Sequence, residues 1–206
     1  MNEHYFSTTS QAAKVEQTRI VTIQNHDFTV TTMPGVFSHD GLDKGTAVLF
    51  RKVPITTLPA DAKVLDLGCG WGPISLALAQ NYPTAEIFAA DVNERAIDLC
   101  KRNLLSAGIS CTVDFESALY DFFVDSGMKL DLIWSNPPIR IGKAELHELL
   151  LRWLALLSSS GVAYFVVQKN LGADSLLIWL NEQGFLTEKI GSAKGFRVIS
   201  VRPQNS

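Results

Sequence analysis

Residues 64–79 read VLDLGCGWGPISLALA, an apolar strand pattern that runs into a glycine-rich turn and then into a helical pattern. Glycines in such a turn let a ligand approach the backbone, and the amino end of the following helix contributes positive potential. Pro73 fits the first turn of that helix. The stretch therefore predicts a strand, a ligand-binding loop and a helix in direct succession.

The spacing of the glycines narrows the class of ligand that this loop would bind. The dinucleotide fingerprint GxGxxG requires glycine where this chain has Pro73, which disfavours a nicotinamide dehydrogenase. Gly68, Gly70 and Gly72 instead follow the spacing GxGxG, and Asp66 lies two residues before them. This arrangement suits a ligand without a pyrophosphate.

Two acidic residues accompany the loop. Asp91 ends the next apolar run, where a carboxylate can accept hydrogen bonds from both hydroxyls of a ribose. The alternative for Asp91 is an N-cap of the helix that begins near Asn93. Asp66 is interpreted as a ligand contact or as a buried group that orders the loop amides, and the two roles are compatible.

Strand and helix patterns alternate along the chain from Lys63 onward. Strands are expected at 64–68, 86–91, 111–116, 130–136 and 161–168, helices at 74–82, 93–108, 143–157 and 174–184, and two final strands at 185–191 and 195–203. This alternation predicts an α/β fold with a Rossmann-like, seven-stranded, mostly parallel sheet, helices on both faces and a C-terminal antiparallel hairpin. One helical stripe is expected to face the core: Leu146, Leu149, Leu150, Trp153 and Leu157.

The region before Lys63 is expected to extend this sheet domain. Patterns at 18–23 and 27–32 predict a small N-terminal β-hairpin, and residues 36–53 read as a loop that runs into a helix. The expected organisation is an N-terminal extension over 1–60, made of a polar tail, the hairpin and a pocket-covering loop and helix. An α/β domain follows over 61–206.

The composition disfavours several classes of protein. The 206 residues are 47% hydrophobic, yet no apolar run approaches the roughly 20 residues that span a bilayer. The N-terminus lacks the basic and apolar regions of a signal peptide. Cys69, Cys100 and Cys111 show no metal-ligand spacing. A cytoplasmic protein with reduced thiols, without a membrane segment or a metal, is therefore expected.

The net charge of −3 argues against a strongly basic nucleic-acid binder, but the charge is unevenly distributed. Residues 1–139 carry a net charge of −6 and residues 140–206 a net charge of +3, so a basic surface is expected only in the later part, with chance asymmetry as the alternative. Candidate phosphate contacts there, each with a solvated surface charge as the alternative, are Lys169, Lys194, Arg197 and Arg202.

Residues 135–139 read SNPPI and follow the apolar run 130–134. Each proline removes a backbone donor and fixes φ, so the strand must end here. Asn136 precedes a proline and is therefore held extended, with its amide presented at the carboxyl end of the strand. A strand terminator with a turn-forming asparagine is the alternative.

Taken together, these residues resemble the class I S-adenosylmethionine (SAM)-dependent methyltransferases, and the resemblance covers about 63–203. The run 66–72, DLGCGWG, matches the nucleotide-binding motif of the family, and Asp91 matches the acid that holds the ribose. The resemblance implies SAM as cofactor and contacts to its adenine from Glu116, Ser117 and Ala118. Ala118 stands where Asp or Asn is frequent, so a backbone contact is expected there.

In this family an Asn-Pro-Pro-aromatic motif ends the fourth strand when the methyl acceptor is an amino group conjugated to a planar system. The resemblance implies that Asn136 Oδ1 and the Pro137 carbonyl accept hydrogen bonds from that amine and aim its lone pair at the sulfonium methyl, which is catalysis by positioning and electrostatics. Pro138 and Ile139 would contact the substrate. Ile139 replaces the usual aromatic residue, and Phe37 is one candidate to compensate.

Residues 28–50, FTVTTMPGVFSHDGLDKGTAVLF, narrow the family further. They resemble the PGVFS…LD.GT..LL signature of the ribosomal small-subunit methyltransferase C-like proteins, which modify guanine N2 in rRNA. The chain looks like a short, single-domain form of these proteins. The resemblance implies that five residues line the cofactor and acceptor pocket: Phe37, Ser38, Asp43, Gly45 and Thr46.

The sequence therefore predicts a SAM-dependent N-methyltransferase that acts on an exocyclic amine of a nucleobase, with guanine N2 in 16S rRNA as the favoured target. Adenine N6, a protein glutamine N5 and a non-catalytic SAM- or RNA-binding module remain alternatives. The expected partner is rRNA or a ribosomal subunit. A monomer is favoured, although the sequence leaves the oligomeric state open.

Overall fold

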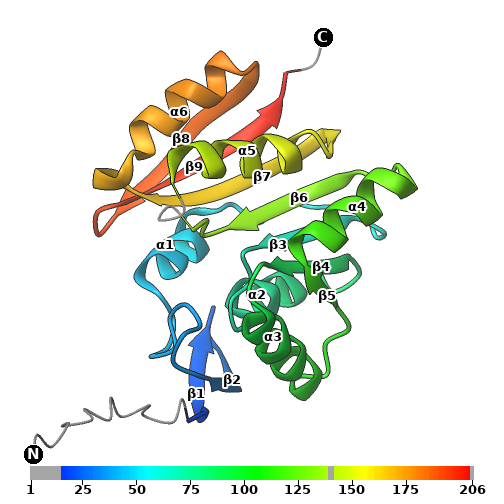
Figure 1. The fold of residues 1–206 in the computed structure, drawn as a ribbon, viewed down its shortest axis with the longest axis vertical. Coiled ribbons are helices and arrows are strands. Elements are labelled where there is room, and N and C mark those ends of the chain that lie inside the picture. The colour runs from blue at the N-terminus through cyan, green and yellow to red at the C-terminus, as the bar shows by residue number, and fades with distance from the viewer. Residues whose placement is uncertain (1–14, 139–141, 205–206) are drawn as a thin grey trace, which may run out of the picture.

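The computed structural model describes residues 15–138 and 142–204 (Figure 1). The strands are β1 (Gln17–Ile23), β2 (His26–Thr32), β3 (Lys63–Leu67), β4 (Glu86–Asp91), β5 (Thr112–Phe115), β6 (Leu130–Ser135), β7 (Leu157–Gln168), β8 (Phe185–Ala193) and β9 (Phe196–Pro203). The helices are α1 (Lys44–Lys52), α2 (Pro73–Asn81), α3 (Glu94–Ser106), α4 (Glu116–Ser126), α5 (Lys143–Leu154) and α6 (Ala173–Glu182), with a short 3₁₀ turn, η2 (Lys169–Leu171).

Seven strands form one sheet in the order β5-β4-β3-β6-β7-β9-β8, and β1 and β2 form a separate hairpin. The five strands from β5 to β7 are parallel, whereas β9 runs antiparallel to both β7 and β8. The predicted fold class, a mostly parallel Rossmann-like sheet with a C-terminal antiparallel hairpin and a small N-terminal hairpin, is confirmed.

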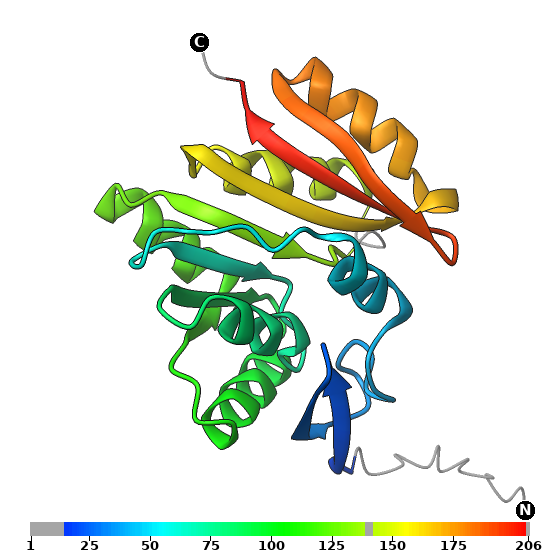
Figure 2. The same ribbon diagram turned by 180° about the vertical axis from the view of Figure 1, so that it is seen from behind.

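Helices cover both faces of the sheet because its central strands are apolar on both sides. Val64 of β3 packs in the core beneath α1, α2 and α3, and its neighbour Leu65 packs in the core beneath α4, α5 and α6. Figures 1 and 2 show these two helical layers from opposite sides. Trp134 of β6 is fully buried and belongs to the core.

The N-terminal hairpin packs against the same core as α2 and α3. Val21, Ile23 and Val30 are buried there and belong to one apolar cluster with the residues of those helices. Within the described ranges, no helix combines the length and the apolar character that crossing a membrane requires.

Two elements differ from the sequence prediction. Helix α4 was not predicted, because the run ESALYDFFVDS mixes acids and aromatic residues; Leu119 and Phe123, four residues apart, bury its inner face. Strand β7 begins at Leu157 instead of residue 161, so the predicted helix 143–157 ends earlier, at Leu154. Gly161 allows this extension, because a Cβ there would lie 2.7 Å from the Leu130 carbonyl oxygen of β6.

Candidate active site

Five consecutive parallel strands end at one edge of the sheet, where ligands bind in open α/β folds. A cavity of about 520 Å³ lies at this edge. The candidate residues from the sequence that line it are Phe37, Asp43, Gly68, Gly70, Asp91, Glu116, Asn136, Pro137 and Pro138. The structure therefore brings together residues from both the N-terminal region and the sheet.

The glycine loop is fixed against β4. The N–H groups of Gly68 and Cys69 both donate to the Ala90 carbonyl, at 2.8 and 3.0 Å, and Gly70 N donates to Asp91 Oδ2 at 2.9 Å. Gly68 and Gly70 have φ values of 80° and 56°, which favour glycine over residues with a side chain. The loop thus presents bare backbone to the cavity.

Asp91 lies at the end of β4 with its carboxylate at the cavity wall. Its Oδ1 accepts from Asn93 N at 2.9 Å, and its Oδ2 accepts from Gly70 N. The N-cap of α3 is Asn93, whose Oδ1 accepts from Arg95 N at 3.1 Å. The N-cap alternative for Asp91 is therefore wrong, and each of its oxygens keeps lone pairs for a ligand.

Asp66 does not line the cavity, and of its two expected roles the structure supports that of a buried group. Its carboxylate is fully buried, and Oδ2 accepts from Ser75 N at 2.9 Å and from Ser75 Oγ at 2.6 Å. Burial raises the pKa of Asp66 to about 7, against the lowering effect of the Ser75 hydrogen bonds. Asp66 therefore ties β3 to the first turn of α2 and orders the loop from beneath.

Gly72 is also absent from the cavity wall. It has a φ of 99°, which favours glycine, and occupies the N-cap position of α2. A Cβ at this position would lie 3.0 Å from the sulfur of Cys100 on α3. Gly72 therefore serves the close packing of the loop on α3, and its predicted contact to the cofactor is not supported.

The amide of Asn136 is held by the start of α1. Its Nδ2 donates to Asp43 Oδ2 at 2.8 Å and to Thr46 Oγ1 at 3.1 Å. Because the Asp43 carboxylate only accepts hydrogen bonds, the amide must turn its nitrogen toward α1. Asn136 Oδ1 makes no hydrogen bond to the described residues and remains available as an acceptor at the cavity wall.

Asp43 is both a cavity residue and the N-cap of α1. The same Oδ2 that accepts from Asn136 also accepts from Gly45 N at 2.6 Å and from Thr46 N at 3.1 Å. Gly45 and Thr46 do not line the cavity; they bond to Asp43 and Asn136, and their expected direct contacts to the cofactor stay predictions. A Cβ at Gly45 would lie 2.8 Å from Asp43 Oδ2, so this cap requires glycine.

Glu116 opens α4 beside the cavity and is almost fully buried. Its Oε1 accepts hydrogen bonds from Arg152 Nη2 and from Trp153 Nε1, the latter at 2.7 Å. Ser117 and Ala118 are exposed and lie outside the cavity wall. Of the three expected adenine contacts, only Glu116 has the required position.

The expected substrate contacts fall into three groups. Pro137 and Pro138 line the cavity, while Ile139 lies outside the described residues. Lys169 and Lys194 are exposed and do not line it; Lys169 N donates to the Gly195 carbonyl at 2.8 Å, which brings η2 next to the β8–β9 turn.

Arg197 is also outside the cavity wall, and its side chain contacts α6. Nη2 lies 2.6 Å from Asp174 Oδ2, and only 18% of the side chain is exposed. A guanidinium that is already paired and largely covered has few N–H groups left to donate to a phosphate. In this structure Arg197 holds the terminal hairpin on α6, and its expected contact to the substrate stays a prediction.

Sequence reasoning missed several residues of the cavity wall. Leu149 was assigned to the core stripe of α5 but faces the cavity, and Gln168, Leu171 and Phe196 line its β7 side. Gln168 had a readable signal, because it is the first polar residue after the apolar run of β7. No pattern in the sequence marked Phe196, because its position depends on the antiparallel pairing of β9 with β7.

Phe37 and Ser38 lie on the segment between β2 and α1. The Phe37 ring is 63% exposed and lines the cavity. Ser38 does not line the cavity; its carbonyl accepts a hydrogen bond from Trp71 Nε1 at 3.2 Å. No cluster of three or more His, Cys, Asp or Glu side chains suitable for a metal occurs in 15–138 and 142–204.

Comparison with known proteins identifies a matching family and several relatives. The chain matches the methyltransferase small domain over residues 27–200. It is 34% identical over 202 residues to the uncharacterized protein YbxB of Bacillus subtilis, which covers 98% of this chain and 99% of that protein.

Two further relatives are larger than this chain. It is 38% identical over 117 residues to the ribosomal RNA small subunit methyltransferase C of Citrobacter koseri, a match that covers 57% of this chain and 32% of that protein. A solved structure of the Thermus thermophilus 16S rRNA N2 methyltransferase RsmC, in complex with AdoMet and guanosine, superposes with a TM-score of 0.74 at 23% identity. It covers 92% of this chain and 51% of that one.

Proposed function

Because the chain belongs to the methyltransferase small domain family, we propose that it transfers a methyl group from SAM to an exocyclic amine of a nucleobase, with guanine N2 of small-subunit rRNA as the target. The observation that carries this proposal is the orientation of Asn136, whose amide nitrogen is bound to α1 while its oxygen remains available at the cavity. In this proposal 61–206 form the methyltransferase domain, and the extension over 1–60 supplies Phe37 and Asp43.

The residues at the cavity fit SAM. Asp91 keeps lone pairs for ribose hydroxyls, and the bare backbone of Gly68 and Gly70 leaves room for the methionyl part. Glu116 lies at the end of the wall formed by β5 and α4, where the adenine would be held. When bound, SAM supplies an electrophilic sulfonium methyl group.

The acceptor amine is a weak nucleophile, because its lone pair is delocalised into the purine ring. Asn136 Oδ1 and the Pro137 carbonyl accept hydrogen bonds from its N–H groups and so favour a more tetrahedral nitrogen whose lone pair is directed at the methyl group. As the N–C bond forms, the bond from the methyl carbon to sulfur breaks, S-adenosylhomocysteine leaves, and the proton of the methylated ammonium passes to water. The two bonds from Asn136 Nδ2 to α1 hold the acceptor oxygen in place before the substrate arrives. Preorganised polar groups of this kind stabilise a transition state without reorganisation.

Two observations support rRNA as the substrate. One relative with 38% identity is a ribosomal RNA methyltransferase by name, and RsmC of similar fold was solved with guanosine. Phe37 presents an exposed ring at the cavity that can stack on a base where Ile139 replaces the usual aromatic residue.

The test is methyl transfer from labelled SAM to total rRNA, to 30S subunits and to 50S subunits from cells that lack this protein. We expect label in N2-methylguanosine of the small subunit, and Asn136→Ala should lower turnover by roughly 10²–10³ while the Kd for SAM stays within about two-fold. Label in adenine or in protein glutamine would show that this group, and not guanine N2, is the methyl acceptor. SAM binding without any transfer would indicate a non-catalytic module, and near-normal turnover of Asn136→Ala would contradict the role of the amide.

A further inference from the structure

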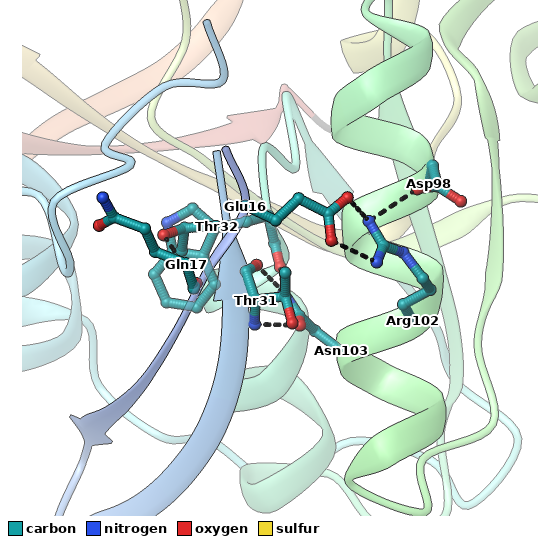
Figure 3. A network of polar contacts seen from close by, with 8 residues as sticks. Glu16, Gln17, Thr31, Thr32, Asp98, Arg102 and Asn103 are labelled. Atoms are coloured by element: carbon teal, nitrogen blue, oxygen red, sulfur yellow. Dashed lines mark hydrogen bonds and ion pairs between the residues drawn. The ribbon is translucent and has the colours of Figure 1, made fainter. Parts of the chain in front are cut away.

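Asn103 is a buried polar residue of α3 that lies between the N-terminal hairpin and the glycine loop. Only 3% of it is exposed. Its Oδ1 accepts from Thr31 N at 2.7 Å, and its Nδ2 donates to the Thr31 carbonyl at 2.9 Å and to the Trp71 carbonyl at 2.8 Å. Figure 3 shows this amide directed from α3 toward β2.

The three bonds connect parts of the chain that are distant in sequence. The pair to Thr31 satisfies both backbone groups of one β2 residue on the edge that faces away from β1, as a neighbouring strand would. The third bond reaches Trp71, which stands between Gly70 and Gly72 in the loop. Asn103 has thus used both amide hydrogens and one lone pair on the backbone of two elements.

A second contact joins the glycine loop to the segment that follows β2. Trp71 is fully buried, and its Nε1 donates to the Ser38 carbonyl at 3.2 Å. Trp71 therefore holds two consecutive parts of the N-terminal region. Its side chain bonds directly to the segment that carries Phe37, and its carbonyl is linked to β2 through Asn103.

We infer that Asn103 is a positioning residue, which sets the distance between the glycine loop and the N-terminal segment and thereby the shape of the cofactor cavity without touching a ligand. The inference rests on the proposed function, because it assigns the cavity to SAM. Removing the amide leaves the buried carbonyl of Trp71 and the partly buried backbone groups of Thr31 without these partners, and we expect the loop to shift in order to satisfy them.

The neighbouring residue supplies a matched control. Arg102 binds Glu16 at 2.9 and 2.7 Å and Asp98 at 2.9 Å, so it also ties the hairpin region to α3 (Figure 3). These pairs are exposed at the surface, where ion pairs contribute little, and none of them involves the loop. Arg102→Gln therefore loosens the same hairpin without disturbing Trp71.

The experiment compares wild type, Asn103→Ala and Arg102→Gln by calorimetric titration with SAM and by hydrogen exchange of the ligand-free proteins, well below each melting temperature. For Asn103→Ala we expect about ten-fold weaker SAM binding, which equals about 1.4 kcal/mol, and faster exchange of the amides in 68–72. Arg102→Gln should keep the wild-type affinity within about two-fold and the wild-type exchange in 68–72.

Asn103→Asp provides a second variant of nearly the same volume, in which an acceptor faces the two carbonyls that require a donor. It should raise the KM for SAM at least as much as Asn103→Ala, with kcat at saturating SAM within about two-fold of wild type. A wild type that binds no SAM would refute the proposed function, and loop exchange alone would then decide the inference. If the wild type binds SAM, Asn103 variants with lower melting temperatures but unchanged SAM affinity and loop exchange would overturn the inference and leave the proposed function intact.

Discussion

Thr46 contacts Asn136 through its hydroxyl, and this contact allows the orientation of the Asn136 amide, for which we propose a catalytic role, to be tested separately from its presence. Thr46→Val has nearly the same shape but removes the Oγ1 acceptor, so that Asp43 alone holds Nδ2. We expect kcat to fall roughly two- to twelve-fold, as for the loss of one neutral hydrogen bond of about 0.5–1.5 kcal/mol, while SAM affinity is unchanged. Steady-state kinetics with saturating SAM measures this.

The Asn136→Ala background provides the control for Thr46. If Thr46 acts only through the amide, Thr46→Val should have no further effect on turnover once Asn136 is an alanine, because the two changes remove the same interaction. Equal effects of Thr46→Val in both backgrounds would show that the hydroxyl acts by another route.

Asp66 makes the stability depend on pH in a direction opposite to most carboxylates. Burial raises its pKa to about 7 in the folded protein, from 3.8, so between these values the folded state binds more protons than the unfolded state, and stability falls as pH rises. Relative to Asp66→Asn, the free energy of unfolding of wild type should decrease between about pH 4 and pH 7, by up to about 4 kcal/mol. Denaturant titrations of both proteins across this range measure the difference, and a constant difference would contradict the assigned cause.

At the residue scale the sequence predicted which loops form the site better than which side chains face it. Gly68, Asp91 and Asn136 line the cavity as expected because each directly follows or ends a parallel strand. Asp66 matches the same motif, yet its side chain lies beneath the loop. The ion pair of Arg197 was not predicted, because its partner, Asp174, comes from a helix whose distance to β9 no local pattern reveals.

At the level of elements, a substitution at Gly161 tests how closely β6 and β7 pack against each other. A Cβ at this position would lie 2.7 Å from the Leu130 carbonyl and 3.1 Å from Ser158 N. Gly161→Ala should therefore lower the free energy of unfolding by about 1–3 kcal/mol, as overpacking in a well-packed region does. Ser160→Ala, at the exposed neighbouring position, should change it by less than about 0.5 kcal/mol. Equal stability of the two variants in thermal unfolding would show that the strands adjust freely.

Elements whose apolar residues follow a clear pattern were predicted, and elements with a weak apolar pattern were not. Strand β4 was predicted at its observed bounds because EIFAAD is apolar and ends at a polar residue. Helix α4 was missed because Leu119 and Phe123 alone mark its buried face, while Phe122 and Val124 are exposed. The early start of β7 depends on its pairing with β6, in which Leu130 lies opposite Leu157, and such pairing is a tertiary property.

At the scale of the whole molecule, the order of the strands explains why distant motifs meet. Gly68, Asp91 and Asn136 follow β3, β4 and β6, which are neighbours in the sheet and run in the same direction. The carboxyl ends of these strands therefore form one wall of the site. The fold class was predictable from alternation alone, whereas the position of α1 across this wall, which brings Asp43 to Asn136, was known only from the resemblance.

The structure also changes which cations are expected to contact RNA. Lys169 and Lys194 are exposed, and the bond from Lys169 N to the Gly195 carbonyl places η2 beside the β8–β9 turn, next to the cavity residues Gln168 and Phe196. Arg197, by contrast, is paired with Asp174. A phosphate contact releases counterions, so each one contributes about one unit to the slope of log K against log salt.

We therefore expect Lys169→Ala combined with Lys194→Ala to weaken RNA binding and to reduce the salt slope by about two units. Arg197→Ala is the control: it should leave the slope unchanged and instead lower the melting temperature, because it removes a bond between the terminal hairpin and α6. Binding of a small-subunit rRNA fragment at several salt concentrations, by fluorescence anisotropy, measures both. A reduced slope in Arg197→Ala with a normal slope in the double lysine variant would show that the ion pair opens on RNA and that the basic surface lies on β9.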